Sequence, residues 1–316
     1  MNIKQNHWYI PDKRWIQWIG VSIVGAIAIV TLIDHWLPYA LLSHHNRAVE
    51  ADPQIFDVYG ISAQTITFET PTYSLAESEE TIQINGWLIP NEMSDRTVII
   101  LHGLGATRQD MLEFGLPLQK VGYNLVLIDL RSHGESGGKF FTYGYHEWQD
   151  VVSLLDWLEQ QAPKAVEDVT LIGVSAGGAI AIPATARDSR IDRLITLSTF
   201  AELGETINTQ TPLLPDRWRR RAIAKAERLA KFEVDATIPR QTIQRVNVPV
   251  LIIHGDVDGY IPFENGQKLY EAAKQPKFFH RSVGADHADI LSQNSTQLNQ
   301  VILDFMGSTL GEESTP

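Results

Sequence analysis

The sequence predicts an α/β protein, in which a doubly wound, mostly parallel sheet carries a small helical cap and follows one N-terminal transmembrane helix. Three observations predict this fold class. The chain has 316 residues, of which 44% are hydrophobic, and this is enough for a large buried core. Short apolar runs alternate with stretches of helical pattern along most of the chain. A single long uncharged run stands near the N-terminus.

The composition excludes several classes of function. The net charge is −12, with 26 basic and 38 acidic residues, which argues against a general nucleic-acid binder because such proteins need a cationic face. The absence of cysteine excludes disulfide frameworks, thiolate metal sites and a cysteine nucleophile.

The uncharged run covers residues 15–33, close to the ~20 residues that cross the hydrocarbon core as a helix. Three basic residues precede the run, whereas Asp34 follows it and the next basic residue is Arg47. The positive-inside bias then predicts a single-pass membrane protein. Residues 1–14 form a cytoplasmic tail, and the body of the protein lies on the extracytoplasmic side, in the periplasm or outside the cell.

Two alternatives to an anchor are a cleaved signal peptide and a buried core helix. A signal peptide has a shorter apolar region followed by a small-x-small cleavage site. Here Ala26 and Ala28 lie inside the apolar run, so an uncleaved anchor is favoured. Residues 34–60 are then expected to be a juxtamembrane linker, residues 61–310 the main domain and residues 311–316 a tail.

The predicted elements of the main domain follow in chain order. Two runs, 66–70 and 81–90, resemble a leading antiparallel pair. Continuous apolar runs of the kind found in strands covered on both faces then occur at 97–103, 124–130, 168–175, 193–199, 249–255 and 277–283. Helical patterns lie between or after them at 109–120, 146–161, 177–186, 264–274 and 294–306. This alternation is typical of a parallel sheet with right-handed crossovers.

A candidate nucleophile stands where the strand 168–175 meets the next helix. Ser175 is the centre of the motif Gly-Val-Ser-Ala-Gly at 173–177, which matches the G-x-S-x-G nucleophile elbow. Such a serine adopts a strained conformation on a sharp turn, which small neighbours accommodate. The helix that follows directs free N–H groups and its positive dipole end at the reacting oxygen.

A serine hydroxyl needs a base that a third group orients. Of ten histidines, His287 is the favoured base because it follows the last strand, in a short polar turn before the final helix. His102 and His254 end strands at tight turns, so structural roles are expected for them.

Three carboxylates are candidates for the orienting acid. Asp258 is preferred, Asp256 is the alternate and Glu202 the third choice. One of the two aspartates is expected to serve the turn itself. The chain order Ser175, Asp258, His287 is the order expected of one particular fold.

A Gly-rich turn at 102–105 follows the strand 97–103. The N–H of Leu104, together with the N–H of Ala176, is predicted to form a two-donor oxyanion hole. The alternative is a plain turn without a catalytic role.

These motifs together resemble the alpha/beta-hydrolase superfamily over about residues 61–310, in the style of its esterase, monoacylglycerol-lipase-like and serine-aminopeptidase-like branch. The motifs that carry the resemblance are HGLG at 102–105, DLRSHGESGG at 129–138, GVSAGG at 173–178, HGDVDGYIP at 254–262 and GADH at 284–287. One departure is Ser132, which stands where the family's D-x-R-G-H-G pattern has glycine.

The resemblance implies a serine hydrolase that cleaves carboxylic or lipid esters through an acyl-enzyme on Ser175. It implies no metal and no organic cofactor, and a small-molecule or lipid ester as the partner. Peptidase or amidase, thioesterase and acyltransferase activities are compatible with the same residues. A catalytically silent binding protein and a non-hydrolytic enzyme are the alternatives from other classes.

An insertion at about 200–247 is long enough for a helical cap over the site. Within it, residues 216–232 carry seven basic and two acidic residues, with apolar residues at helical spacing. This segment is either a cap helix with a solvated basic face, or a helix that lies near anionic lipid headgroups beside the anchor.

Overall fold

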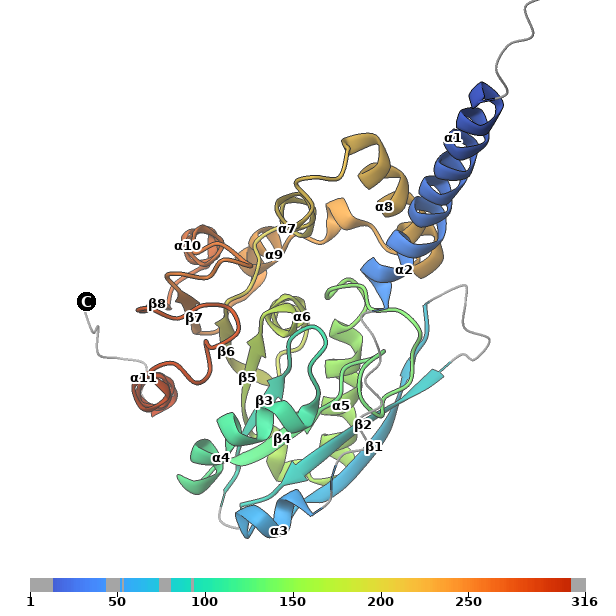
Figure 1. Cartoon of the computed structure of the whole chain (residues 1–316). Coiled ribbons are helices and arrows are strands. Elements are labelled where there is room, and N and C mark those ends of the chain that lie inside the picture. The colour runs from blue at the N-terminus through green and yellow to red at the C-terminus, as the bar shows by residue number, and fades with distance from the viewer. Residues whose placement is uncertain (1–13, 44–51, 53, 74–80, 92–93, 308–316) are drawn as a thin grey trace, which may run out of the picture.

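The computed structural model describes residues 14–43, 52, 54–73, 81–91 and 94–307. The predicted tails, 1–14 and 311–316, lie outside the described residues apart from Arg14. The centre of the fold is an eight-stranded sheet in the order β1-β2-β4-β3-β5-β6-β7-β8, with helices on both faces (Figure 1). The predicted fold class is confirmed.

The strands are β1 (Gln64–Pro71), β2 (Thr81–Ile89), β3 (Arg96–Leu101), β4 (Asn124–Ile128), β5 (Asp168–Val174), β6 (Ile191–Leu197), β7 (Val250–Gly255) and β8 (Lys277–Ser282). As predicted, β1 and β2 form an antiparallel pair. β2 also runs antiparallel to β4, and all the remaining pairs are parallel. The carboxyl ends of the parallel strands therefore meet at one edge of the sheet.

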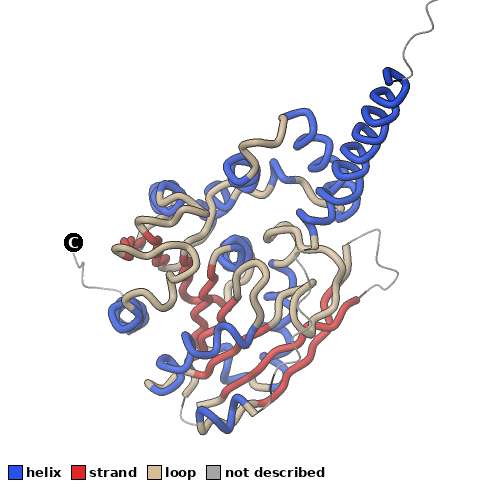
Figure 2. The backbone as a smooth tube through the Cα atoms, in the orientation of Figure 1, coloured by secondary structure: helices blue, strands red, loops and turns tan. Residues whose placement is uncertain are grey.

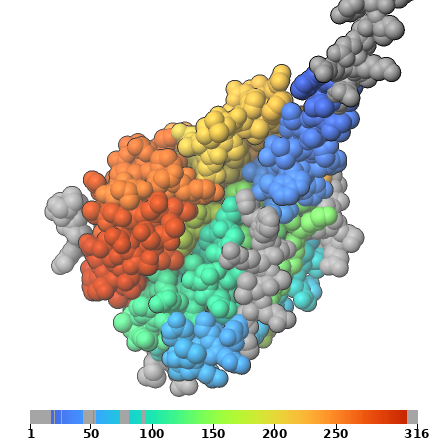
Figure 3. Space-filling model, viewed as in Figure 1, coloured from blue at the N-terminus to red at the C-terminus, as the bar shows by residue number. Residues whose placement is uncertain are grey.

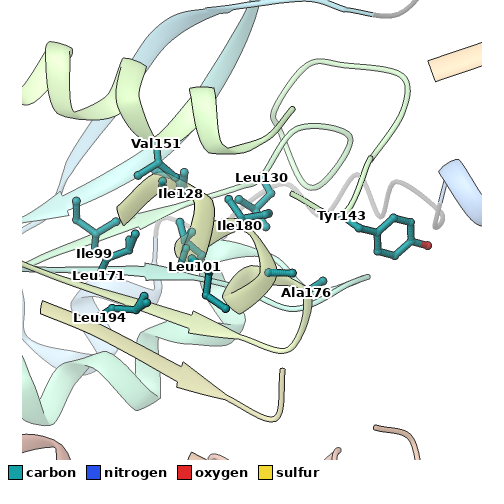
Figure 4. Packing of buried hydrophobic residues seen from close by; sticks show 14 of the residues in the cluster. Ile99, Leu101, Ile128, Leu130, Tyr143, Val151, Leu171, Ala176, Ile180 and Leu194 are labelled. Carbon is teal, nitrogen blue, oxygen red and sulfur yellow. The ribbon is translucent and has the colours of Figure 1, made fainter. Parts of the chain in front are cut away.

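Helices cover both faces because the central strands are apolar on both sides. One face carries α5 (Trp148–Gln161), α6 (Ala176–Thr185) and α10 (Glu264–Ala272). The other face carries α4 (Leu112–Lys120), which follows the 3₁₀ turn η2 (Arg108–Met111), and α11 (Ser295–Gly307). In the first layer, Ile99 and Leu101 of β3 pack with Val151 of α5 and Ile180 of α6 (Figure 4). This packing holds the central strands in place, and the candidate site lies at their carboxyl ends.

The N-terminal segment is one unbroken helix, made of α1 (Arg14–Thr31), the π-helical turn η1 (Leu32–Trp36) and α2 (Leu37–Leu42). Among the described residues it is the one helix long and apolar enough to cross a membrane, by the stretch Val21–Leu42. α1 stands away from the body (Figures 1 and 2). Its described apolar side chains, such as Val24 and Ile27, are exposed. A core helix would bury these side chains, so a membrane span or a signal sequence fits the segment better.

The described part of the segment 34–60, expected to be a linker, packs on the body. Leu42 is fully buried, and its carbonyl accepts a hydrogen bond from the N–H of Phe141 at 2.9 Å. Further along, the short helix α3 (Ile55–Tyr59) sets Phe56 edge-on against Trp87 of β2. The apolar side chains that follow α1 thus pack on the body of the protein.

Helices and loops without strands lie between β6 and β7, over the carboxyl edge of the sheet (Figure 2). They are α7 (Leu203–Gln210), α8 (Asp216–Ala230), η4 (Val234–Ala236), α9 (Pro239–Thr242) and η5 (Ile243–Arg245). Outside this region, the 3₁₀ turn η3 (Pro163–Val166) precedes β5. The basic helix α8 buries Ala222, Ala226 and Ala230. In the space-filling view this cap lies beside the N-terminal helical segment (Figure 3).

Candidate active site

Ser175 lies on the sharp turn between β5 and α6, at the carboxyl edge of the sheet. Its backbone has φ 54° and ψ −117°, a conformation that L-residues rarely adopt and that marks functional strain. The small neighbours are required by packing. A Cβ on Gly173 would stand 2.4 Å from the Gly177 carbonyl oxygen, and a Cβ on Gly177 would stand 2.4 Å from the Leu101 carbonyl oxygen.

The structure brings together three residues that are far apart in the chain. Ser175 Oγ lies 2.9 Å from His287 Nε2, and His287 Nδ1 lies 2.8 Å from Asp258 Oδ2. Both distances are those of hydrogen bonds. In this arrangement His287 Nδ1–H donates to the carboxylate, which leaves Nε2 free to accept the serine proton.

Asp258 is buried and held from its other oxygen. Oδ1 accepts hydrogen bonds from the backbone N–H groups of Tyr260 at 3.0 Å and Ile261 at 2.7 Å. Burial opposes ionisation of this carboxyl, but the hydrogen bonds from His287 and Ile261 outweigh burial, so the pKa of Asp258 lies below its usual value. The residue is therefore a fixed carboxylate directed at the imidazole.

The other two carboxylates have different partners. Asp256 accepts the N–H of Gly284 at 2.7 Å and pairs with Arg281, so it ties the β7 turn to the turn after β8. Glu202 pairs with Arg240. Of the three candidates, Asp258 is the one whose carboxylate contacts His287.

His102 and His254 are buried and bonded to backbone groups. His102 Nδ1 lies 2.7 Å from the Gly103 carbonyl oxygen, and its Nε2 accepts the N–H of Leu130 at 3.0 Å. Burial lowers the pKa of His102 to about 3, so the ring is neutral at physiological pH. His254 Nε2 lies 2.9 Å from the Ile261 carbonyl oxygen, next to the backbone that holds Asp258.

His133 supports the 102–105 turn, a role that the sequence pattern left unassigned. Its Nε2 accepts the N–H of Gly105 at 3.1 Å, and its Nδ1 lies 3.0 Å from the Arg131 carbonyl oxygen. The ring also packs edge-on against His102, with 5.0 Å between centroids. Burial lowers the pKa of His133, and a neutral ring is what lets Nε2 accept. The position of His133 in a D-x-R-x-H-G motif was the one signal that could have indicated this contact.

The 102–105 turn lies directly against the serine, since a Cβ on Gly103 would stand 3.2 Å from Ser175 Cβ. Leu104 and Ala176 both line the cavity that reaches Ser175. The Ala176 N–H is among the first four of α6, which have no acceptor within the helix. Within the described part of the chain, the Leu104 N–H has no protein acceptor either. Both donors are thus available to an oxygen bound beside Ser175.

Ser175 opens onto two spaces. One is an apolar cavity of about 210 Å³, roofed by the cap and lined near the serine by Leu104, Tyr143 and Phe200. The other is an open depression lined by Gly105, Gly259, Tyr260, Asp286 and His287. Ser175 is therefore accessible both from an apolar space and from an open depression.

No group of three or more His, Asp or Glu side chains that could hold a metal ion occurs in the described ranges. The groups around Ser175 in the structure are the imidazole of His287, the carboxylate that contacts it and the two backbone N–H donors.

Comparisons with known proteins agree with this fold. Residues 96–237 match the family model described as alpha/beta hydrolase fold. The chain is 25% identical to the protein YqkD of Bacillus subtilis over 312 residues, which cover 93% of this chain and 97% of that protein. It is 26% identical over 234 residues to the lysophosphatidylserine lipase ABHD12 of Xenopus tropicalis, covering 67% of this chain and 58% of the lipase. The solved esterase Pf2001 of Pyrococcus furiosus shares the fold, with a TM-score of 0.65, 24% identity and coverage of 84% and 98% of the two chains.

Proposed function

The chain belongs to the alpha/beta-hydrolase superfamily, and from this premise we propose that it is a serine hydrolase that cleaves carboxylic or lipid esters through an acyl-enzyme on Ser175. The hydrogen-bonded series from Ser175 through His287 to Asp258, at 2.9 and 2.8 Å, is the observation that carries the proposal.

In the proposed reaction, Ser175 Oγ attacks the ester carbonyl while His287 Nε2 removes its proton. The N–H groups of Leu104 and Ala176 stabilise the negative charge that develops on the carbonyl oxygen. His287 then donates the proton to the departing alkoxide, while Asp258 stabilises the imidazolium. A water molecule, activated by the same histidine, hydrolyses the acyl-enzyme and frees the acid.

The two spaces beside Ser175 favour an ester with an apolar acyl group. The larger share of the acyl-side lining is aliphatic or aromatic, and burial of methylene groups there supplies binding energy. Peptide, amide and thioester cleavage and acyl transfer use the same catalytic residues, so a substrate panel has to distinguish them. ABHD12, a lipase by name, is consistent with the ester assignment.

We further propose that α1 is an uncleaved membrane anchor, with the N-terminus in the cytoplasm and the body on the extracytoplasmic side. The support for this orientation is the charge asymmetry of the sequence around residues 15–33. The exposed apolar side chains of α1 need a non-aqueous environment, which a bilayer provides.

A fluorophosphonate probe tests the proposed function. The wild-type chain should be labelled covalently, and Ser175→Ala should not be labelled. Ser189→Ala, which changes an exposed serine away from the site, is the matched control and should be labelled like the wild type. Equal labelling of Ser175→Ala would refute the nucleophile, and an unlabelled wild type would favour the silent binding protein. Esters of increasing acyl length, tested beside aminoacyl amides and thioesters, then identify the bond that is cleaved.

A further inference from the structure

One wall of the acyl cavity comes from the N-terminal helical segment rather than from the hydrolase domain. Leu37, Ala40 and Leu41 of α2 line the cavity. A further part of the lining belongs to the cap and includes Ile207 of α7 and Ile223 of α8. The lining of the cavity that reaches Ser175 therefore combines two segments that are separated by more than 150 residues in the sequence.

α2 is held in place by bonds at its C-terminal end. The hydroxyl of Tyr143, whose side chain also lines the cavity, donates to the Leu41 carbonyl oxygen at 2.7 Å. The N–H of Phe141 donates to the Leu42 carbonyl oxygen at 2.9 Å. These bonds satisfy two of the carbonyl groups that a helix end leaves without partners.

The turn before α2 is bonded to the cap. Asp34 of η1 receives two hydrogen bonds from the Arg221 guanidinium, at 2.6 and 2.9 Å. Lys225, one turn further along α8, donates to the Asp34 carbonyl oxygen. The helical segment is thus attached to the cap on one side and to the 140–143 loop on the other, and the wall it contributes is part of the folded body.

The size of the cavity limits what it can hold. A methylene group is about as large as a water molecule, whose share of liquid volume is about 30 Å³. A cavity of about 210 Å³ therefore has room for at least several such groups, as an apolar acyl chain requires.

We infer that α2, the continuation of the apolar N-terminal helix, is a specificity-determining wall of the acyl site, and that the substrates are esters of an apolar acyl chain. The inference rests on the proposed function, because it concerns the acyl side of the same reaction. Side chains at positions 37, 40 and 41 set the acyl length that the site accepts.

The test uses the full chain in detergent and a series of p-nitrophenyl esters from acetate to palmitate. For the wild type, kcat/KM should rise by roughly fourfold per added methylene until the cavity is full, and then level off or fall. Ala40→Trp fills the cavity from α2, so it should move the optimum to shorter chains. We expect the ratio of the octanoate to the acetate kcat/KM to fall on the order of 10- to 50-fold.

Leu37→Ala enlarges the cavity from the same helix and should move the optimum to longer chains. The matched control is His35→Trp, which adds the same indole to the same helical segment at an exposed position outside the cavity lining. It should keep the wild-type chain-length profile. Opposite shifts from the two cavity variants are not expected of general damage to the fold.

The outcomes separate this inference from the proposed function. A chain-length profile that both cavity variants share with the wild type, in proteins that the fluorophosphonate still labels, would overturn the inference and leave the hydrolase intact. A wild-type chain that is neither labelled nor active on acetate would overturn the proposed function itself. If Ala40→Trp does not fold, the shift expected of Leu37→Ala decides the question alone.

Discussion

Replacing Asp258 by Asn tests the orienting role of the carboxylate while preserving its shape. In the structure, Asp258 Oδ1 accepts two backbone N–H groups and Oδ2 faces His287 Nδ1. An asparagine at this position keeps its oxygen on the two backbone donors, so its NH₂ group faces the imidazole. Because NH₂ donates, it favours the tautomer with the proton on Nε2, and this tautomer cannot accept the proton of Ser175.

The expected loss follows from that tautomer. The corresponding change in a well-studied serine protease, a worked example of the general triad, lowers kcat by about 10⁴. We expect a fall of about 10³ to 10⁴ in kcat on p-nitrophenyl acetate, which is about 4 to 5.5 kcal/mol in activation free energy. The rate of fluorophosphonate labelling should fall in parallel.

Asp256→Asn is the matched control for Asp258→Asn. It makes the same chemical change two residues away, on a carboxylate bonded to Gly284 and Arg281, and should keep the wild-type kcat. Thermal unfolding of both variants establishes that they are folded. A loss below about tenfold in Asp258→Asn, or an equal loss in the two variants, would refute the assignment of the acid, because the orienting interaction is worth far more than that.

Three further predictions follow from other contacts. Ser132 has φ 64°, so Ser132→Gly should raise the unfolding free energy by about 1 kcal/mol, measured by urea denaturation. The pKa of His102 is lowered to about 3, so the stability that its neutral ring contributes is complete above pH 6.5 and is lost as the pH falls toward 3. Lowering the pH from 6.5 to 5 should therefore reduce the unfolding free energy by about 2 kcal/mol. The variant His102→Asn should show a weaker dependence of unfolding free energy on pH. Arg217, Arg220 and Arg228 are exposed on α8. Their joint replacement by Gln should weaken binding to anionic vesicles by about 1 kcal/mol per residue, measured in a flotation assay with neutral vesicles as control. Unchanged binding would indicate that the basic face of α8 is simply solvated.

The strand and helix order could be predicted because it depends on local patterns. Continuous apolar runs such as 124–130 mark strands that are buried on both faces, and β4 occupies that position. The residues at the strand ends could also be predicted to meet, because parallel strands place their carboxyl ends at one edge. Ser175, Asp258 and His287 lie together for this reason.

The docking of α2 could not be predicted in the same way. In the sequence, Leu37, Leu41 and Leu42 extend the apolar N-terminal run, and the pattern does not show whether a membrane, water or protein surrounds them. Their burial depends on the 140–143 loop and on α8, which are far away in the chain. The role of His133 depends likewise on a contact with the N–H of Gly105.

The basic segment 216–232 shows how pairing changes the interpretation of a charge pattern. Arg219 is turned toward the carbonyl oxygens of Thr211 and Leu214 and pairs with Asp216. Arg221 pairs with Asp34. Part of the local positive charge therefore pairs within the cap and with the N-terminal segment. Arg217, Arg220, Arg228 and Lys231 remain exposed and can face an anionic partner.

The unbroken helix from α1 to α2 has a mechanical consequence. A flexible tether lets an enzyme explore a volume that grows with the length of the tether. A continuous helix that is bonded to the body at one end instead restricts rotation of the body relative to the helix. With a rise of 1.5 Å per residue, Leu37 stands about 9 Å from Thr31, where α1 ends. With α1 embedded in a bilayer, the opening of the Ser175 cavity would stay at a constant distance from the membrane. The same face of the body would always be turned toward the lipid surface. A substrate held in the same bilayer would then reach the site by lateral diffusion in two dimensions.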